Sequence, residues 1–140
     1  MKLEVPATPP AVMEAVDALR EFCSDQGAPL SVSQELSLAL EEILANVVNH
    51  GYQGDATKFA QVELRCEGQS VVAVVRDQAA AYDPLSAPEP DLESDLDDRP
   101  IGGLGIHLVR ELMDEVSYER ADGENRVTFR KTWDSDPQPD

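Results

Sequence analysis

The feature that most constrains the fold is the segment SVVAVVRD, residues 70–77, which is almost wholly apolar and rich in β-branched valine. The segment before it, FAQVELRC at 59–66, alternates apolar and polar residues, and the short turn EGQ joins the two. This pattern predicts a β-hairpin. A second hairpin is predicted from VSYER at 116–120 and NRVTFRKTW at 125–133 around the turn ADGE. The chain is therefore expected to build a sheet, with helices covering one of its faces.

Two helices are predicted in the first half of the chain. Residues 9–27 carry apolar residues at helical spacing, and the glycine that ends this range is a stop signal. The second helix is predicted to begin with Ser31 or Ser33 as its N-cap, and Gln34 follows Ser31 at the spacing of a capping box. It is expected to run to His50 and to stop at the glycine that follows.

The remaining segments complete an α+β arrangement. A short strand is predicted over 2–7, and a glycine turn opens a short helix over 102–115. Residues 84–100 are rich in proline and acidic residues without periodicity, as expected of a long loop. The order β-α-α-β-β-loop-α-β-β predicts a two-layer α/β sandwich, a mostly antiparallel mixed sheet with its helices on one face. We expect one domain over 1–133 and a flexible tail over 134–140.

Composition excludes several classes of function. The chain has 140 residues, 41% of them apolar, and a formal net charge of −17. This charge argues against binding to nucleic acid or to an anionic membrane surface, because both are bound by clustered Lys and Arg. Cys23 and Cys66 lack metal-ligand spacing and are expected to be buried thiols. No signal peptide and no apolar run of membrane-spanning length is visible, so a cytoplasmic protein is predicted.

The second helix carries an unusual polar face. At 100° per residue its apolar positions form one core stripe, whereas Glu42, Asn46 and Asn49 fall on the other side, with His50 at the border. Such a set can be an ordinary solvated face. Asparagine is however a poor helix former, and carboxylate and carboxamide oxygens four residues apart can hold a hard cation such as Mg²⁺. The same carboxylate could also accept a proton from a hydroxyl or water.

Two further elements favour a ligand site. In RPIGGLGIHLVREL, residues 99–112, three glycines precede an apolar helix and leave backbone N–H groups free to face a phosphate. A turn with an ordinary cap is the alternative. Asp77 ends the most apolar strand, where its carboxylate could accept from an exocyclic amine of a base, or could simply terminate the strand in a turn.

These pieces in this order resemble the ATP-binding fold shared by histidine kinases, heat-shock-ninety chaperones, type II topoisomerases and mismatch-repair ATPases, the GHKL or Bergerat fold. The segments that carry the resemblance are LALEEILANVVNHGY, VVRDQAAAYDP and RPIGGLGIHLVRELMDEVSYER, within residues 5–132. In the size of the chain and the wording of these motifs, it is most similar to the anti-sigma-factor serine/threonine kinases, the switch kinases of bacterial partner-switching systems.

The resemblance implies a role for each matching residue. Glu42 would be the general base of an E-x-x-x-N box, Asn46 the Mg²⁺ ligand, and Asp77 the acceptor for the adenine amine. Residues 84–100 would be the ATP lid. The residues that would contact or support ATP are Asn46, Asn49, His50, Asp77, Ala79, Tyr82, Gly102, Gly103, Leu104 and Gly105, with Gly103 and Gly105 packed against the phosphates.

One position departs from the family. Its second box usually reads D-x-G-x-[GA]-[FY]-D-P, whereas this chain has DQAAAYDP, with Ala79 at the first glycine. Alanine resists the close approach and the positive φ that glycine allows, so weaker adenine binding is expected. Tyr82, Asp83 and Pro84 keep the rest of the box.

Three functions stay open at this point. The first is a MgATP-dependent kinase that phosphorylates a serine of a small antagonist protein of the STAS type. The second is a non-catalytic, nucleotide-sensing module that sequesters a sigma factor or an antagonist, which Ala79 slightly favours. The third, a detached ATP-binding domain of a larger histidine-kinase-like system, lacks a phosphoacceptor histidine helix. The sequence does not decide the identity of the partner or the oligomeric state, a homodimer included.

Overall fold

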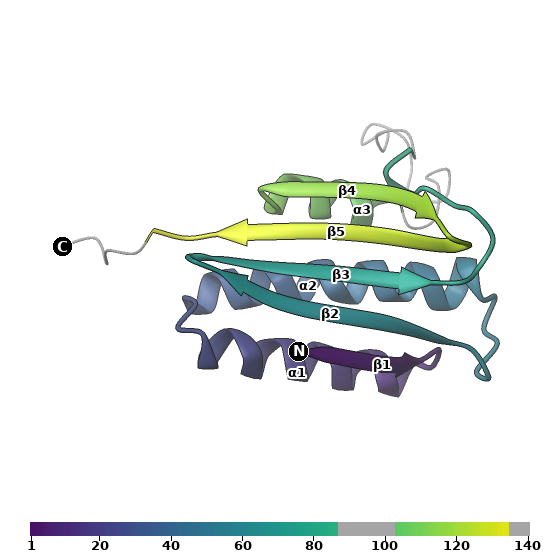
Figure 1. The fold of residues 1–140 in the computed structure, drawn as a ribbon, viewed down its shortest axis with the longest axis horizontal. Helices are drawn as coiled ribbons and strands as arrows, with labels where there is room; N and C mark the ends of the chain where they lie inside the picture. Colours follow the sequence, from purple (N-terminus) through teal and green to yellow (C-terminus); the bar gives the residue numbers. More distant parts are fainter. Residues whose placement is uncertain (87–102, 135–140) are drawn as a thin grey trace.

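The computed structural model of the protein describes residues 1–86 and 103–134. Figure 1 shows a single sheet with the helices lying behind it. The strands are β1 Lys2–Pro6, β2 Phe59–Glu67, β3 Ser70–Asp77, β4 Glu115–Ala121 and β5 Glu124–Thr132. The helices are α1 Pro9–Asp25, α2 Leu30–Asn46 and α3 Gly103–Leu112, with a π-helical turn at Val47–Gly51 and a 3-10 turn at Pro84–Ser86.

The sheet has the order β1-β2-β3-β5-β4, and each neighbouring pair is antiparallel. Both predicted hairpins are confirmed, as β2–β3 and β4–β5. The apolar segment at 70–77 is the middle strand of the sheet, which explains why almost all of its side chains are buried. The register of β3 with β5 places Asp77 directly opposite Asn125.

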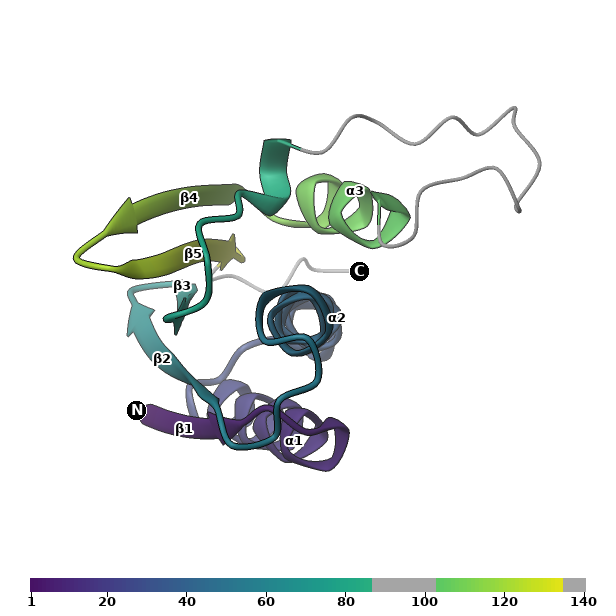
Figure 2. The same cartoon turned by 90° about the vertical axis from the view of Figure 1, so that its right-hand side faces the viewer.

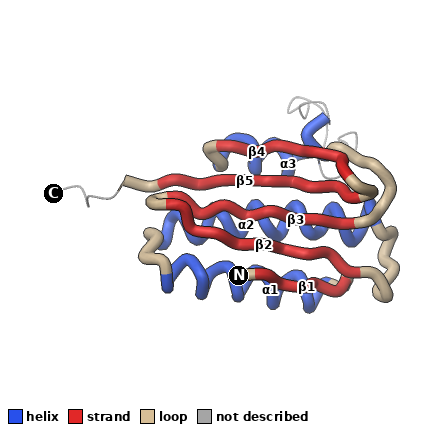
Figure 3. Tube along the Cα trace, viewed as in Figure 1, coloured by secondary structure: helices blue, strands red, loops and turns tan. Residues whose placement is uncertain are grey.

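All three described helices cover the same face of the sheet. Seen from its end in Figure 2, the sheet lies on one side and α1, α2 and α3 on the other; Figure 3 shows the helices in blue behind the red strands. The predicted two-layer α+β sandwich is therefore confirmed. The core lies between the layers and includes the predicted stripe of the second helix: Leu36, Leu40, Ile43, Leu44 and Val47 are all buried.

The ends of the first two helices differ from each other. α1 is capped by Thr8, whose Oγ1 accepts from the Ala11 N–H at 3.3 Å. It is followed by Gly27 at φ +78°, which confirms the predicted stop. The capping box predicted for α2 is wrong. Pro29 in extended conformation is the N-cap, without a side-chain hydrogen bond, and its carbonyl accepts from the Ser33 N–H, so both predicted serine caps lie inside the helix.

The second helix also ends differently from the prediction. Regular α-helix stops at Asn46, and the next five residues, Val47–Gly51, wind as a π-turn. Because a π-turn has more residues per turn than an α-helix, positions after Asn46 no longer follow steps of 100°. Asn49, expected below Asn46 on one face, is instead exposed to solvent.

Some predicted features lie outside the described residues. Of the expected ATP lid, 84–100, only the 3-10 turn Pro84–Ser86 is described, and Gly102 and residues 135–140 of the tail also lie outside. Both cysteines are free thiols; Cys23 is buried as predicted, whereas Cys66 near the end of β2 is only partly buried. In residues 1–86 and 103–134 no helix has the length and apolar character that crossing a membrane requires.

Candidate functional site

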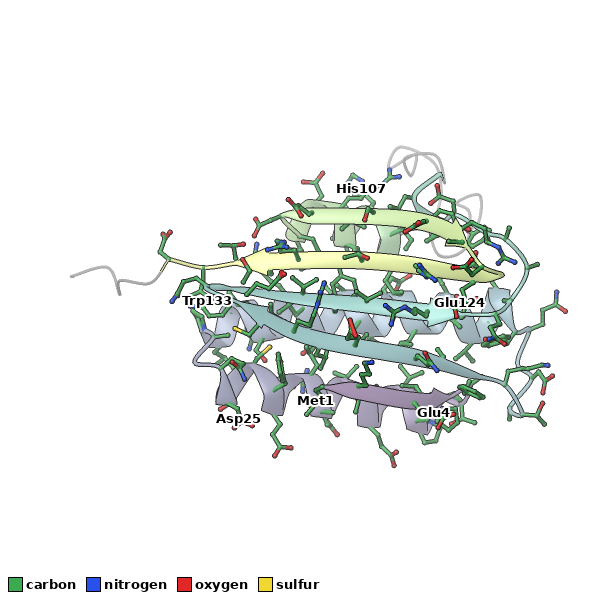
Figure 4. The ribbon with its side chains drawn as sticks, viewed as in Figure 1. Met1, Glu4, Asp25, His107, Glu124 and Trp133 are labelled. Carbon is green, nitrogen blue, oxygen red and sulfur yellow. The ribbon has the colours of Figure 1, made fainter. Side chains whose placement is uncertain are left out.

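The polar residues of interest meet at one end of the sheet. The C-terminal part of α2, the end of β3 and the start of β5 converge there, and Figure 4 places Glu124, the first residue of β5, at this end and Trp133 at the other. Antiparallel pairing brings the last residue of β3, Asp77, beside Asn125 of β5. Both side chains are buried, and Asn125 Nδ2 donates to Asp77 Oδ1 at 2.9 Å.

Asn125 is the centre of a hydrogen-bond network that the sequence reasoning missed. Its Oδ1 accepts from the Tyr118 hydroxyl at 2.6 Å and from the Tyr82 N–H at 3.3 Å. Its Nδ2 donates to Asp77 and also to the Ala80 carbonyl at 3.0 Å. The side chain thus uses both its donor and its acceptor capacity and ties β5 to the loop that follows β3.

A second side chain from the same hairpin holds this loop. Arg120 Nη1 donates to the Ala79 carbonyl at 2.8 Å. The Ala79 N–H donates in turn to Asp77 Oδ1 at 2.9 Å. Asp77 therefore has one oxygen committed to the protein, whereas Oδ2 has no hydrogen-bond partner within the described residues. A carboxylate oxygen without a partner is available to an external donor.

A small cavity lies between α2 and this end of the sheet. Its volume is about 30 Å³, which is room for about two water molecules. Asn46, Asp77 and Asn125 supply polar groups to it, and Tyr82 closes it on one side. The complete lining is Ile43, Asn46, Val47, Gly51, Asp77, Ala80, Tyr82, Pro84, Asn125 and Val127.

A larger cavity of about 390 Å³ lies beside it. It shares Asp77 and Ala79 with the site, but its other walls come from the segment before β2 and from Gln61, Arg76 and Glu124. It contains neither Glu42 nor Asn46. Of the polar residues singled out from the sequence, Asn46 lines only the small cavity, Asp77 lines both cavities, and Glu42 lines neither.

Ala79, the departure from the family pattern, is packed against the π-turn. A Cβ placed on Gly51 would lie 3.1 Å from the Ala79 Cβ, which is tighter than ordinary van der Waals contact. Ala79 is buried, and Gly51 leaves the space that it occupies. The methyl group of Ala79, at a position where the family usually has glycine, thus fits because the facing residue, Gly51, has no side chain.

Tyr82, which lines the small cavity, stacks against His50. Their ring centroids are 6.3 Å apart and the rings are inclined by 27°. Both residues are exposed, so the pair forms an outer edge between the π-turn and the loop after β3. A contact of this geometry adds only about 0.5–1.5 kcal/mol, which leaves the edge easy to open.

Glu42 lies one turn before Asn46 on α2, and both side chains are half-buried. Burial raises the pKa of Glu42, and the nearby charge of Glu41 raises it further, whereas His50 lowers it. Neither Glu42 nor Asn46 has a side-chain hydrogen bond or ion pair within the described residues. A half-buried carboxylate of raised pKa without a partner can act as a base.

The predicted glycine segment contacts Glu42 through Gly105. Gly105, in the first turn of α3, faces its carboxyl group: a Cβ added there would overlap with the carboxylate carbon and both oxygens. Gly103 begins α3 and Leu104 follows it. The structure therefore places Asn46, Asp77 and Tyr82 around the small cavity. Ala79 packs against Gly51, and Glu42, one turn before Asn46, lies against Gly105. Asn49 and His50 do not line the cavity.

The described residues offer no preformed metal centre. Within 1–86 and 103–134, no three His, Cys, Asp or Glu side chains lie close enough to bind an ion together. A magnesium ion at Asn46 would therefore need most of its ligands from elsewhere.

Sequence comparisons agree with this fold. The family described as the histidine kinase-like ATPase domain matches residues 5–131. The serine/threonine-protein kinase BtrW of Bordetella bronchiseptica is 38% identical over 94 residues, which is 67% of this chain and 66% of that protein. The serine-protein kinase RsbW of Bacillus subtilis is 26% identical over 128 residues, 88% of this chain and 79% of that protein. The chain thus spans just under two thirds of the Bordetella protein.

Solved structures are similar in fold. The RsbU and RsbW domains of Rv1364c from Mycobacterium tuberculosis match with a TM-score of 0.66 and 21% identity, over 94% of this chain and 32% of that one. The SiaB–SiaC complex from Pseudomonas aeruginosa matches with a TM-score of 0.58 and 18% identity, over 95% of this chain and 89% of that one. At these identities the likeness concerns the fold.

Proposed function

Because the chain belongs to the histidine kinase-like ATPase domain family, we propose that it is a protein serine/threonine kinase that transfers the γ-phosphate of ATP to a serine of a small antagonist protein. The observation that carries this proposal is the position of Glu42 and Asn46, one turn apart on α2 beside the cavity that Asp77 lines. The names of the relatives, serine- and serine/threonine-protein kinases, support it.

In the proposed complex, adenine lies against Asp77. The exocyclic amine of the base donates to Asp77 Oδ2, while Oδ1 stays bound to Asn125 and to the Ala79 N–H. A cavity of about 30 Å³ is too small for a purine, so the His50–Tyr82 edge has to move when nucleotide enters. Ala79 narrows the same region, which supports weaker adenine binding than a glycine would give.

Asn46 suits a magnesium ion that arrives with ATP. Its carboxamide has no hydrogen bond within the described residues, and Mg²⁺ is usually bound by one or two protein oxygens together with substrate phosphates. Bound there, the ion would neutralise charge on the phosphates. Asn49, His50 and the glycine segment that includes Gly102, Gly103 and Leu104 are proposed to lie near the phosphates or to support their binding.

Glu42 is proposed to act as the general base. Its carboxylate takes the proton of the attacking serine hydroxyl, the serine oxygen bonds to the γ-phosphorus, and the bond from that phosphorus to the β,γ-bridging oxygen breaks to release ADP. The products are ADP and phosphoserine, and the proton leaves from Glu42 to solvent. A base of this kind contributes roughly 10²–10⁴ in rate.

One observation favours a second function. Ala79 is packed against Gly51, and the cavity beside them is small. A module that binds its partner without phosphoryl transfer would tolerate such a pocket. On this alternative the chain sequesters a sigma factor or an antagonist, and nucleotide modulates that binding or has no part in it.

Transfer of label from γ-³²P-ATP to a cognate antagonist of the STAS type separates the two functions. The kinase proposal expects one phosphate on one serine and an equal amount of ADP, with no label on an antagonist whose acceptor serine is alanine. Tight binding of the antagonist without any label would favour the second function. A sigma factor as a further partner, and a homodimer as the assembly, are proposals from the family resemblance that the same preparation can test.

A further inference from the structure

Gly105 lies against the carboxyl group of Glu42, the proposed base. The inference drawn from this contact rests on the proposed function. The three atoms nearest to a Cβ at position 105 are the carboxylate carbon and the two carboxylate oxygens of Glu42, all of them closer than real Cβ atoms approach. The carboxyl group thus fills the volume that any side chain at 105 would need. In this respect Gly105 differs from Gly27, Gly54, Gly68 and Gly123, around which a Cβ would meet nothing within 4 Å.

The position of α3 on α2 is fixed at its other end by Lys131 of β5. Lys131 Nζ lies 2.9 Å from Glu35 Oε2 of α2 and donates to the Leu112 carbonyl, the last residue of α3, at 2.7 Å. Glu35 and Glu42 are seven residues apart on α2, and Leu112 and Gly105 are seven residues apart on α3. The two helices therefore run antiparallel. The two contacts are about 10 Å apart along each helix, since seven residues separate them in both.

Apolar packing prevents α3 from sliding to relieve a clash. Ile106, Val109 and Met113 are buried in the core below it, and Lys131 would lose a contact if the helix moved. A methyl group at 105 would meet the carboxylate group, the most mobile part of the pair. The side chain of Glu42 would then have to turn away from its present position.

We infer that Gly105 is a positioning residue for Glu42: its missing side chain lets the first turn of α3 lie directly on the carboxyl group of the base. The role differs from the phosphate contact that the family resemblance implies for this glycine. A glycine in a helix is costly relative to alanine, so a purely structural role predicts that alanine at 105 stabilises α3. A positioning role predicts that alanine displaces the base.

The test is Gly105→Ala in the full chain, with Arg110→Ala as the control because Arg110 is exposed further along α3. Single-turnover phosphoryl transfer to the antagonist is expected to fall about 10²-fold, the cost of misplacing a reacting group by ~1 Å. The Kd for MgATP, measured by calorimetry, is expected to stay within about twofold. Arg110→Ala is expected to change neither. A Kd that rises in step with the loss of rate would show that Gly105 faces the nucleotide instead, and would overturn the inference.

Thermal unfolding decides the contact independently of kinase activity. Gly105→Ala is expected to raise Tm more in a Glu42→Ala background, where the space is free and the helix propensity of alanine prevails, than in the wild-type background, where the Glu42 carboxylate has to turn away. Rescue of folding by Glu42→Ala, if Gly105→Ala alone does not fold, is the same result in stronger form. An equal shift in both backgrounds, or failure to fold in both, would refute the contact. Should the wild type transfer no phosphate while the shift in Tm still differs between the two backgrounds, the kinase proposal fails and the contact stands.

Discussion

The two sides of the small cavity are built differently. On the sheet side, Asp77 and Asn125 are buried and joined to each other, and Asn125 also bonds to the loop after β3 and to Tyr118. On the helix side, Asn46 lines the cavity and Glu42 lies one turn before it on α2; both are half-buried and have no hydrogen-bond partner within the described residues. The sheet side is therefore organised before any ligand binds, whereas the polar groups of the helix side are left for a ligand to satisfy.

This difference matches the chemistry proposed for each side. A base is recognised by fixed donors and acceptors, which a rigid network provides. Phosphate groups and their metal ion are charged, and they can bind to side chains that have no partner before the ligand arrives. Substitutions on the two sides should accordingly affect different quantities: stability on the sheet side, ligand binding and rate on the helix side.

The largest effect is expected from Asn125→Ala. It removes the hydrogen bonds of Asn125 to buried Asp77, which keeps its bond from the Ala79 N–H, to half-buried Tyr118 and to the Ala80 carbonyl, each worth about 0.5–1.5 kcal/mol. We expect the free energy of unfolding in urea to fall by about 2–4 kcal/mol. Thr128→Ala, on the same strand, is the control and should change it by less than about 1 kcal/mol. A loss for Asn125→Ala no larger than the control would contradict the rigid sheet side.

Gly51→Ala tests the packing of Ala79 and should have the next largest effect. The added methyl group lies 3.1 Å from the Ala79 Cβ, and overpacking of this kind costs about 1–3 kcal/mol. The double variant with Ala79→Gly removes the clash and should recover most of that stability. Ala79→Gly alone should leave nucleotide affinity unchanged or improve it, with a possible cost of about 0.5–1 kcal/mol from backbone entropy. Additive effects in the double-mutant cycle would show that the two residues do not interact.

Asn46→Ala should separate binding from stability on the helix side. Because no described residue depends on this carboxamide, the free energy of unfolding should change by less than about 0.5 kcal/mol. The Kd for MgATP should rise about tenfold, equivalent to 1.4 kcal/mol, while the Kd for ATP in EDTA should change little. An unchanged Kd for MgATP would remove Asn46 from the metal site.

The smallest effect is the pH dependence that Glu42 gives to stability. Because burial raises its pKa in the folded chain, the folded state binds more protons than the unfolded state as pH rises through the ordinary carboxyl range, and stability falls over that window. Glu42→Gln should therefore raise Tm slightly near pH 7, and this gain should disappear as pH falls below about 4, where both states are protonated. Glu14→Gln, exposed on α1, should show no such trend. A gain for Glu42→Gln that is equal at both pH values would contradict the cause given for the shift.

Much of the fold could be predicted from local patterns. The two hairpins follow from alternation and turn residues, and the buried stripe of α2 follows from helical periodicity. The N-cap of α2 was harder to predict from the sequence. Ser31 and Ser33 both have the residue type of a cap, but the extended conformation of Pro29 decides where the helix begins. The π-turn after Asn46 left no clear signal, and it moved Asn49 off the predicted face.

The candidate site was only partly visible in the sequence. Glu42, Asn46 and Asp77 stand out as polar residues at positions where helix or strand patterns do not favour them. Asn125 has the same signal, since asparagine is depleted in strands and alternates with the buried Val127 and Phe129, but its role depends on a pairing with Asp77 that only the sheet order reveals. The contact between Gly105 and Glu42 likewise joins segments more than sixty residues apart.

The central claim is that Glu42, whose carboxylate has no hydrogen-bond partner within the described residues, acts as the base of phosphoryl transfer. The most direct measurement is single-turnover transfer from ATP to the cognate antagonist by Glu42→Gln, with the Kd for MgATP and for the antagonist measured on the same preparation. Glutamine keeps the shape of the side chain and removes the base, so both Kd values should stay near those of the wild type while transfer slows at least ~100-fold. Transfer at the wild-type rate by Glu42→Gln, or a wild type that binds its antagonist tightly and transfers nothing, would contradict the account.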